Sequence, residues 1–392
     1  MDDPLDNPLG NPLDGPGLEA LHGRRSVKWQ LYGPDVLPLW VAEMDVVPAE
    51  PVQRAVVEAV RAGDTGYPWA PDYTEALASF ASRRWGWQPD PATMSLVPDV
   101  MLGVVEVLKL LTSPGDAVVV SSPVYPPFFQ FVQSLGRRVV EAPLTAEGRL
   151  DPATLEDAFA MATRGAGRAA YLLCNPQNPT GAVHTAAELT AALEVASAFG
   201  VRVVADEIHA PLAHPGVRFT PVASLPAGSG AVSLMSASKA FNLAGLKAAV
   251  AVPGPDAVDD LARIPEEVSH GASHLGVIAH RAAYLDGGAW LDALLDGLAA
   301  NRRLLGELLA EQLPDVRYRE PEGTFLAWLD FSAYDLGADP AATLRERAKV
   351  ALHPGPGFGH GGTGHARLNF GTSPAILREA VGRIAAAVQP RS

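Results

Sequence analysis

Three short stretches of the sequence place reactive side chains directly after apolar runs. Asn178 lies in CNPQNPTG after AAYLL, Asp206 opens DEIHA after VRVVA, and Lys239 lies in SASKAFNLAGLK after AVSLM. Taken singly, each stretch has an ordinary explanation as a turn, a helix cap or a surface lysine. An amide, an acid and a lysine that each follow an apolar run indicate one shared reactive site.

This trio is suited to a Schiff base between a lysine amine and pyridoxal phosphate (PLP). The amine of Lys239 would form the linkage, and it needs a lowered pKa to act as a nucleophile. Asp206 would face the pyridine nitrogen and keep it protonated, and Asn178 would lie near the ring oxygen. Hydroxyls and a cation suited to the phosphate dianion follow at Ser236, Ser238 and Lys247.

The elements that would position these groups are indicated by apolar runs that alternate with helical patterns from about residue 50 onward. Four runs are predicted as strands: 117–120, 169–174, 201–205 and 231–235. Strands that alternate with helices predict an α/β fold with a doubly wound, mostly parallel sheet. Ligands of such sheets bind beyond the carboxyl ends of the strands, where the three reactive stretches occur.

Composition narrows the class of protein. A chain of 392 residues is long enough for two domains. Its formal net charge of −14 argues against nucleic acid or an anionic membrane surface as the main partner. Cys174 is the only cysteine, so no intrachain disulfide can form and a cytoplasmic location is expected. No apolar run approaches the roughly 18 residues of a membrane-spanning helix.

Longer motifs identify a resemblance to the fold type I PLP-dependent enzymes of the aminotransferase class I/II superfamily. These motifs are SVKWQ, LPLWVAEMD, GYPW, SSPVYPPF, LLCNPQNPTG, ADEIHAPL, SASKAFNLAGL, PEGTFLAWLDF and ARLNFGTS. SVKW, WVAEMD, DEIH and KAFNLAGL indicate in particular the cystathionine β-lyase (C–S lyase) branch of the MalY/PatB kind. The similarity extends from about Arg24 to Val388, and it implies that Lys239 and Asp206 are catalytic.

The resemblance also implies roles that spacing alone does not assign. Tyr125 would stack on the cofactor ring, and Arg367 would bind the substrate α-carboxylate through its planar guanidinium. The backbone at Val100 and Met101, which open a helix ending near residue 111, would receive the phosphate. Tyr67 would reach across a homodimer interface into the partner's site, contact the substrate there and act as a third catalytic residue. Asn178 would contact the substrate as well as the cofactor.

One position departs from the family pattern, and two others can be interpreted in two ways. Asp99 stands beside the expected phosphate site, where relatives often carry glycine. His209 is interpreted either as a cofactor contact or as a packed histidine. Trp40 is interpreted either as a wall of the substrate pocket or as a core residue. No cluster of cysteines or acids completes a metal site with the histidines, so no metal is expected.

The implied reaction is α,β-elimination, which converts L-cystathionine or another cysteine S-conjugate to a thiol, pyruvate and ammonia. An aminotransferase would use the same residues, so only the branch-specific motifs favour the lyase. A regulatory PLP-binding protein is a third possibility, disfavoured because Lys239, Asp206 and Arg367 are all present. The motifs do not identify the natural thioether substrate.

The domain prediction has three parts. Residues 1–17 repeat Asn/Asp-Pro-Leu without periodicity and are predicted to be a mobile tail. Residues 46–285 are predicted to form the large PLP-binding domain. Residues 18–45 and 286–392 are predicted to form a smaller α/β domain, joined to the large one through the helical stretch 287–313.

Overall fold

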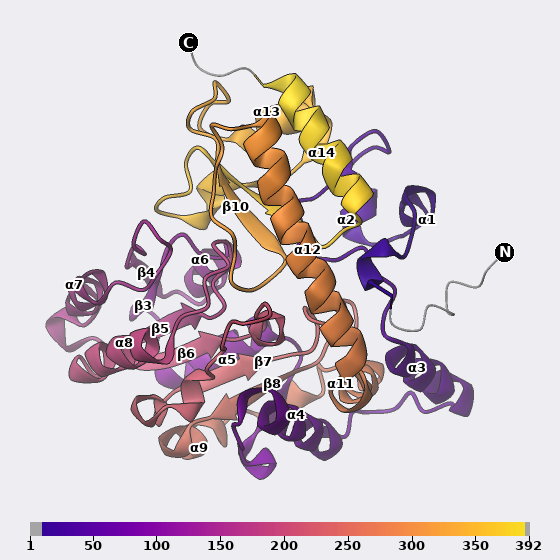
Figure 1. The fold of residues 1–392 in the computed structure, drawn as a ribbon. Coiled ribbons are helices and arrows are strands. Elements are labelled where there is room, and N and C mark those ends of the chain that lie inside the picture. Colours follow the sequence, from indigo (N-terminus) through magenta and orange to yellow (C-terminus); the bar gives the residue numbers. More distant parts are fainter. Residues whose placement is uncertain (1–9, 389–392) are drawn as a thin grey trace.

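The structure, a computed structural model, describes residues 10–388 and is centred on a seven-stranded sheet (Figure 1). The strand order is β2-β8-β7-β6-β5-β3-β4. Strand β8 pairs antiparallel with both β2 and β7, and the remaining pairs are parallel. The strands are β2 (Ser95–Val97), β3 (Ala117–Val120), β4 (Arg138–Glu141), β5 (Ala169–Cys174), β6 (Arg202–Asp206), β7 (Val232–Met235) and β8 (Ala249–Pro253).

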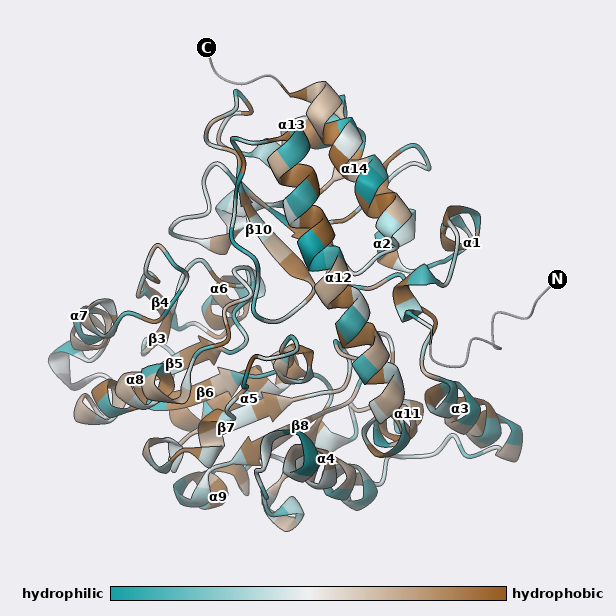
Figure 2. Cartoon of the chain, in the orientation of Figure 1, coloured by the Kyte–Doolittle hydropathy of each residue, from teal (hydrophilic) through white to brown (hydrophobic). Residues whose placement is uncertain are grey.

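Both faces of this sheet are apolar because successive side chains of a strand point to opposite sides. Val118 and Leu172 belong to the core cluster on one face, and Val119 and Leu173 belong to the cluster on the other. The first face packs on α5 (Val100–Leu111), α6 (Pro127–Ser134) and α9 (Val258–Leu261), and the second on α7 (Pro152–Ala162) and α8 (Ala186–Ala198). The strands are mainly brown in Figure 2, as expected of a sheet covered on both faces. The predicted α/β class and its four strands are confirmed, with boundaries that agree within one residue.

A second sheet has four antiparallel strands in the order β12-β13-β10-β9. They are β9 (Arg317–Tyr318), β10 (Leu326–Asp330), β12 (His353–Pro354) and β13 (His365–Asn369). A short parallel pair, β1 (Leu37–Pro38) with β11 (Val350–Ala351), lies on the same side of the molecule. The 25-residue helix α12 (Gly288–Gln312) runs from the seven-stranded sheet to this region, where it packs on α14 (Pro374–Ala387) (Figure 1). The domain boundaries remain a prediction.

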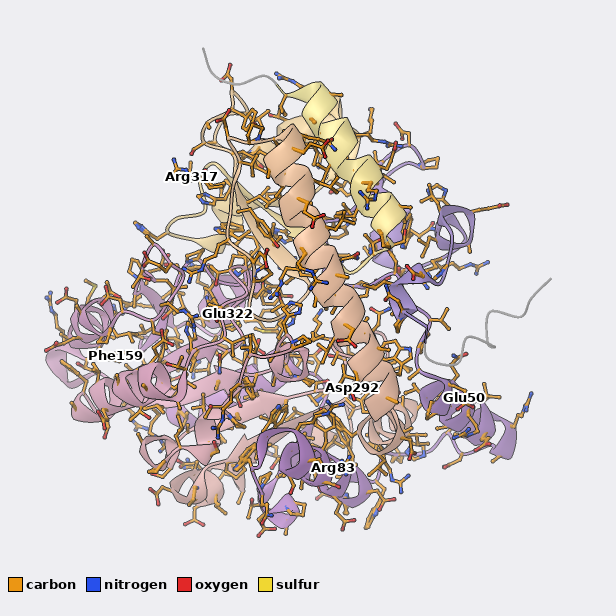
Figure 3. All side chains as sticks on the ribbon, viewed as in Figure 1. Glu50, Arg83, Phe159, Asp292, Arg317 and Glu322 are labelled. Carbon is orange, nitrogen blue, oxygen red and sulfur yellow. The ribbon has the colours of Figure 1, made fainter. Side chains whose placement is uncertain are left out.

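The other helices cover the sides of the molecule. They are α1 (Leu18–His22), α2 (Val27–Gln30), α3 (Glu50–Ala62), α4 (Ala70–Trp85), α10 (Glu266–Ser269), α11 (His274–Asp286) and α13 (Pro340–Arg347). Helix α11 packs on both α3 and α4. In Figure 3 the charged Glu50 and Arg317 lie at the periphery, whereas Phe159 of α7 is fully buried. Within residues 10–388, no helix is long and apolar enough to cross a membrane.

The structure corrects the inner boundary of the predicted tail. Pro12–Asp14 forms a short 3-10 helix that contacts α12, and the Asn11 side chain accepts a hydrogen bond from the N–H of Leu13. Leu13 is fully buried in the main core, a position that a mobile segment would not keep. A single leucine with a helix to pack against thus outweighs the polar, proline-rich composition. The rest of the predicted tail, residues 1–9, lies outside the described part of the chain.

Candidate active site

The three reactive stretches meet because β5, β6 and β7 are neighbours in the sheet. Cys174 at the end of β5 lies opposite Asp206 at the end of β6, and Asp206 lies opposite Leu234 of β7. Because the three strands are parallel, the turns after them leave from one edge of the sheet. Asn178, Asp206 and Lys239 therefore line one cavity of about 250 Å³ at that edge.

Most of the predicted site residues line this cavity. They are Val100, Met101, Tyr125, Asn178, Asp206, His209, Ser238, Lys239 and Lys247. Ser236, Trp40, Arg367 and Tyr67 are not among its lining residues. The sequence interpretation did not anticipate Ala42, Phe131, Cys174 or Ile208 in the lining, and small or apolar residues of this kind carry no local signal of a site.

Lys239 has the environment that a nucleophilic amine requires. It is partly buried, and its Nζ donates a hydrogen bond to the carbonyl of Ala42 at 2.9 Å. Burial, with a further contribution from the Arg367 guanidinium, lowers the pKa of Lys239 to about 8. At pH 7 about a tenth of the amine is therefore neutral and able to react with a carbonyl, far more than for an ordinary lysine.

Asp206 is a buried carboxylate with spare hydrogen-bonding capacity. Its Oδ1 accepts a bond from the N–H of Ile208 at 3.1 Å, and burial raises its pKa to about 6. The Ile208 bond and the nearby Lys239 oppose that rise. A carboxylate held in this way favours a cation placed opposite it, which is what a protonated pyridine nitrogen would be.

Arg367 is a buried cation that forms no salt bridge within residues 10–388. It is 2% exposed, its two terminal nitrogens donate to Asn178 Oδ1 at 2.8 Å and to the carbonyl of Trp40 at 3.0 Å, and its Nε has no partner within residues 10–388. The same arginine lies over the ring of Phe358. Because a buried charge is costly unless it is paired, this arrangement favours an anionic ligand such as a carboxylate.

The part of the cavity lined by the start of α5 is suited to a phosphate. Helix α5 begins at Val100, and the first N–H groups of a helix form a natural anion site. Asp99 accepts a bond from the N–H of Leu102 at 2.8 Å and so caps the helix, while its other oxygen pairs with Lys247 at 2.8 Å. The departure at Asp99 is therefore explained as a helix cap, and it places an acid beside the cation expected to meet the phosphate.

Taken together, these groups fit PLP. Lys239 offers an amine, Asp206 a carboxylate for the ring nitrogen, and Asn178 an amide near the base of the site. Tyr125, in the turn before α6, is partly buried and lines the cavity, so its ring is available for the predicted stacking. Its pKa is raised by burial, so the ring stays neutral. Lys239, Asp206, Asn178 and Tyr125 all line the same cavity, as binding of one PLP molecule requires.

Ser236 and His209, two of the predicted cofactor contacts, also bind or pack against other parts of the protein. The hydroxyl of Ser236 donates to the carbonyl of Ala248 at 2.7 Å and accepts a bond from the N–H of Ser238, so it shapes the turn and lies outside the cavity lining. His209 lies in the turn after β6 and lines the cavity, although it also packs edge-on against Phe325. Burial lowers the pKa of His209 well below its usual range, so the imidazole is neutral.

Tyr67 and Trp40, the two aromatic residues predicted to contact the substrate, do not line the cavity of the single chain. Tyr67 is 83% exposed, packs against His270 and does not line the cavity. Trp40 contacts Tyr32 edge-on, and its indole N–H is buried without a partner in the described part of the chain. The contribution of Tyr67 to a partner's site stays a prediction.

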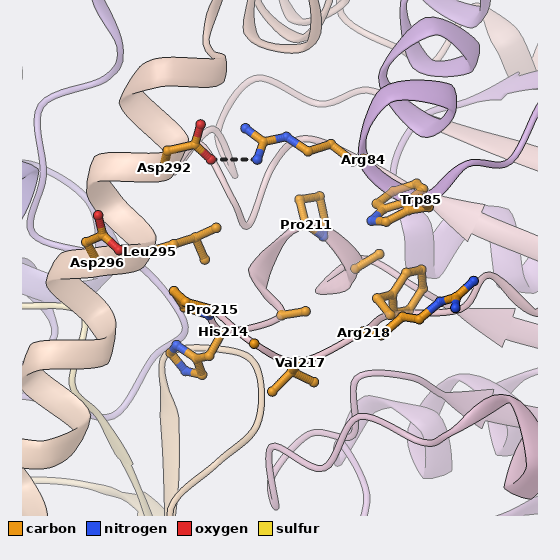
Figure 4. Close-up of a pocket in the computed structure, with 14 residues that line it drawn as sticks. Arg84, Trp85, Pro211, His214, Pro215, Val217, Arg218, Asp292, Leu295 and Asp296 are labelled. Carbon is orange, nitrogen blue, oxygen red and sulfur yellow. Dashed lines mark hydrogen bonds and ion pairs between the residues drawn. The ribbon is translucent and has the colours of Figure 1, made fainter.

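A separate hollow of about 360 Å³ lies between the end of α4, residues 210–219 and α12 (Figure 4). Arg84 pairs with Asp292 across its upper part, and Arg218 and Asp296 also line it. This hollow contains no lysine and none of the predicted site residues. The candidate active site is therefore the smaller cavity at the strand ends.

The comparisons with known proteins agree with this geometry. Residues 47–384 match the profile of "Aminotransferase class I and II". A Mycobacterium leprae protein provisionally named a cystathionine beta-lyase is 54% identical over 95% of this chain and 96% of its own. "Cystathionine beta-lyase PatB" of Bacillus subtilis is 36% identical, covering 93% and 97%. The crystal structure of a provisionally identified PLP-dependent beta-cystathionase from Corynebacterium diphtheriae has a TM-score of 0.89 and 34% identity, covering 95% and 98%. The chain therefore belongs to the aminotransferase class I and II family.

Proposed function

We propose that the protein is a PLP-dependent C–S β-lyase that cleaves L-cystathionine or another cysteine S-conjugate to a thiol, pyruvate and ammonia. The observation that carries the proposal is the combination of an amine with a lowered pKa, Lys239, and a buried guanidinium, Arg367, whose partners are an amide and a carbonyl. An α-amino acid supplies the missing carboxylate and carries the Cα proton that an amine base can remove.

The residues of this chain divide the work of elimination. Arg367 and Asn178 hold the substrate carboxylate, and Asp206, Tyr125 and the start of α5 hold the cofactor. PLP, when bound, supplies an electron sink for the negative charge that develops at Cα. The neutral amine of Lys239 would take the Cα proton, the Cβ–S bond would break, and the sulfur would leave as a thiolate that is protonated to the thiol. Hydrolysis of the remaining three-carbon enamine consumes one water and releases pyruvate and ammonia.

The choice between lyase and aminotransferase is supported by the relatives, since the site residues serve both reactions. Relatives that carry a cystathionine beta-lyase name include proteins 54% and 36% identical to this chain over almost its whole length. A relative named for aspartate aminotransferase is 26% identical. The lyase is therefore the better supported activity.

The deciding experiment mixes the purified, PLP-loaded protein with L-cystathionine and no α-keto acid. Pyruvate and free thiol are expected in equal amounts, and neither should form with Lys239→Ala. Turnover that appears only when an α-keto acid is added would replace the lyase with an aminotransferase. Turnover of a bulkier cysteine S-conjugate but not of L-cystathionine would keep the elimination and change only the substrate.

We further propose a cytoplasmic homodimer in which Tyr67 acts in the partner's site. The proposal is supported by the exposure of Tyr67 (83%) and of nearby Trp69 (65%), which are large apolar side chains of the kind that interfaces cover. Mixed dimers of Tyr67→Phe and Lys239→Ala chains test it. If Tyr67 acts in trans, one site in each mixed dimer has both residues, and activity exceeds that of either parent. If mixing restores nothing, Tyr67 does not act in trans.

A further inference from the structure

Residues 40–45, with the sequence WVAEMD, form a segment that contacts both cations of the candidate site. We call this segment the strap. The carbonyl of Ala42 accepts a hydrogen bond from Lys239 Nζ at 2.9 Å, and the carbonyl of Trp40 accepts one from Arg367 at 3.0 Å. The two cations therefore take their acceptors from positions two residues apart on one stretch of backbone.

Each cation is followed along the chain by an asparagine that also holds the strap. Three residues after Lys239, the side chain of Asn242 bonds to both the N–H and the carbonyl of Met44, at 2.8 and 2.9 Å. Two residues after Arg367, the amide of Asn369 donates to the carbonyls of Val41 and Glu43 at 2.8 and 2.7 Å.

As a result, every carbonyl from Trp40 to Met44 accepts a bond from a side chain. The register of the strap thus determines where the acceptors of Lys239 and Arg367 lie. A shift of the strap by one residue would misplace both acceptors together.

The far end of the strap is held by a buried ion pair. Lys28 and Asp45 are 0% and 1% exposed, and Lys28 Nζ lies 2.8 Å from Asp45 Oδ2. Lys28 also donates to the carbonyl of Glu43 at 2.9 Å, and the indole N–H of Trp29 donates to Asp45 Oδ1 at 3.0 Å. The Asp45 N–H bonds to the carbonyl of Gly371, which follows Asn369 by two residues.

These contacts explain why two motifs of the sequence occur together. SVKW (residues 26–29) and WVAEMD (residues 40–45) supply no acid, base or cation assigned above to the chemistry, yet they bind each other through Lys28, Trp29 and Asp45. A buried ion pair is weak evidence for stability, because desolvation offsets its attraction, but it can specify a single register.

We propose that the Lys28–Asp45 pair is a positioning device that fixes the register of the strap and thereby orients Lys239 and Arg367 for cofactor and substrate. The proposal rests on the function proposed above. Lys28 and Asp45 are positioning residues, because they act only through the strap. Loosening the strap should chiefly weaken capture of the substrate carboxylate, since Arg367 would lose one of its two fixed acceptors.

The test uses the double variant Lys28→Met/Asp45→Asn in the PLP-loaded enzyme. It removes both charges, keeps side chains of similar length, and leaves an oxygen to accept the Trp29 indole N–H. Replacement of a buried pair in this way is often neutral for stability, so a melting temperature close to that of the wild type is expected. The KM for the thioether should rise about tenfold, the scale of one misplaced hydrogen bond to a charged group, with a smaller change in kcat.

A second readout does not require turnover. Binding of L-alanine, which has the same carboxylate but no leaving group, can be followed by the change in the cofactor's visible absorbance. Its Kd should also rise about tenfold in the double variant, as expected from the same hydrogen bond. This readout separates the two proposals, because it applies even if no thioether is cleaved by the wild type.

The matched control is Lys349→Met/Asp35→Asn, which makes the same two substitutions in an exposed ion pair outside the strap. Its KM and its Kd for L-alanine should stay at the wild-type values. A double variant with a lowered melting temperature but wild-type KM and L-alanine Kd would show that the pair is only structural and would overturn the proposal. If the double variant does not fold, Trp29→Phe removes a single donor to Asp45 and should raise both constants about two- to threefold. Unchanged constants in that variant would also overturn it.

Discussion

Asp206 and Arg367 reach the candidate site from two sheets that hold them in different ways. Asp206 ends a strand of the mostly parallel sheet, and its carboxylate is bonded to the N–H of Ile208, two residues along the chain. Arg367 lies inside β13 of the antiparallel sheet, and its partners Asn178 and Trp40 are 189 and 327 residues away in sequence. The Asp206 carboxylate on the cofactor side of the site is thus oriented by a local turn, whereas the Arg367 guanidinium on the substrate side depends on packing between distant segments.

The two sides also differ in charge behaviour. Burial raises the pKa of Asp206 to about 6 and lowers that of Lys239 to about 8, so both groups titrate near neutral pH. Burial lowers the pKa of Arg367 only to about 10, so this residue stays charged. The cofactor side can therefore exchange protons, while the substrate side acts as a fixed anchor.

The largest effect is expected from Lys239→Ala, which removes the chemistry of the cofactor side. Loss of a positioned general base costs about 10²- to 10⁴-fold in rate, and the covalent link to the cofactor is lost as well. Steady-state pyruvate formation and the absorbance of the bound cofactor measure the two losses. Lys109→Ala, on the exposed side of α5, is the control and should behave as the wild type. Full activity in Lys239→Ala would show that Lys239 is not the reactive amine.

Arg367→Lys should affect the substrate side and spare the cofactor side. A lysine keeps the charge but cannot make the guanidinium's several directed bonds, each worth about 1.5–3 kcal/mol when a charged group is involved. The KM for the amino acid should rise roughly 10- to 100-fold. Arg317→Lys, at an exposed position of the edge strand β9 in the same sheet, is a matched control. A large fall in cofactor affinity with an unchanged KM would contradict the division between the two sides.

The pH dependence of cofactor uptake connects the two sides. Because the pKa of Lys239 is lowered to about 8, the reactive neutral amine is present above that pH and disappears below it. The rate at which the cofactor-free enzyme links PLP should therefore rise about tenfold per pH unit up to about pH 8 and then level off. Stopped-flow absorbance measures this rate.

A substitution of Arg367 tests whether the substrate side affects the pKa of Lys239. Because the Arg367 guanidinium contributes to the lowered pKa of Lys239, Arg367→Gln should move the midpoint of the uptake profile to higher pH. An unchanged midpoint would mean that the substrate side does not influence the amine on the cofactor side.

The smallest effect is expected from Asp99→Asn. Asparagine caps a helix as well as aspartate does, so α5 should be unaffected, while the acid that pairs with Lys247 is lost. Removing a negative charge from the start of this helix should tighten PLP binding roughly two- to fivefold, corresponding to about 0.5–1 kcal/mol. Fluorescence titration of the cofactor-free protein measures the affinity. Weaker binding would show instead that Asp99 holds Lys247 in position for the phosphate.

Much of the fold could be predicted because its signals are local. The runs that became β3, β5, β6 and β7 are mainly apolar, as strands buried on both faces require, and each is followed by a polar turn. Composition was a poorer guide at residues 10–17, where Leu13 packs into the core despite its polar neighbours. The environment of one leucine depends on what lies beside it in space.

The same distinction holds for the site. Sequence alone determined Lys239, Asp206 and Asn178 as a cluster, because parallel strands in one sheet deliver the residues after them to a common edge. Tertiary structure alone decided that Ser236 would shape a turn, that the carbonyl of Ala42 would meet Lys239, and that Lys28 and Asp45 would hold the strap. These contacts join residues that are far apart in the chain or involve backbone atoms common to every residue. Their partners are determined only when the whole chain packs.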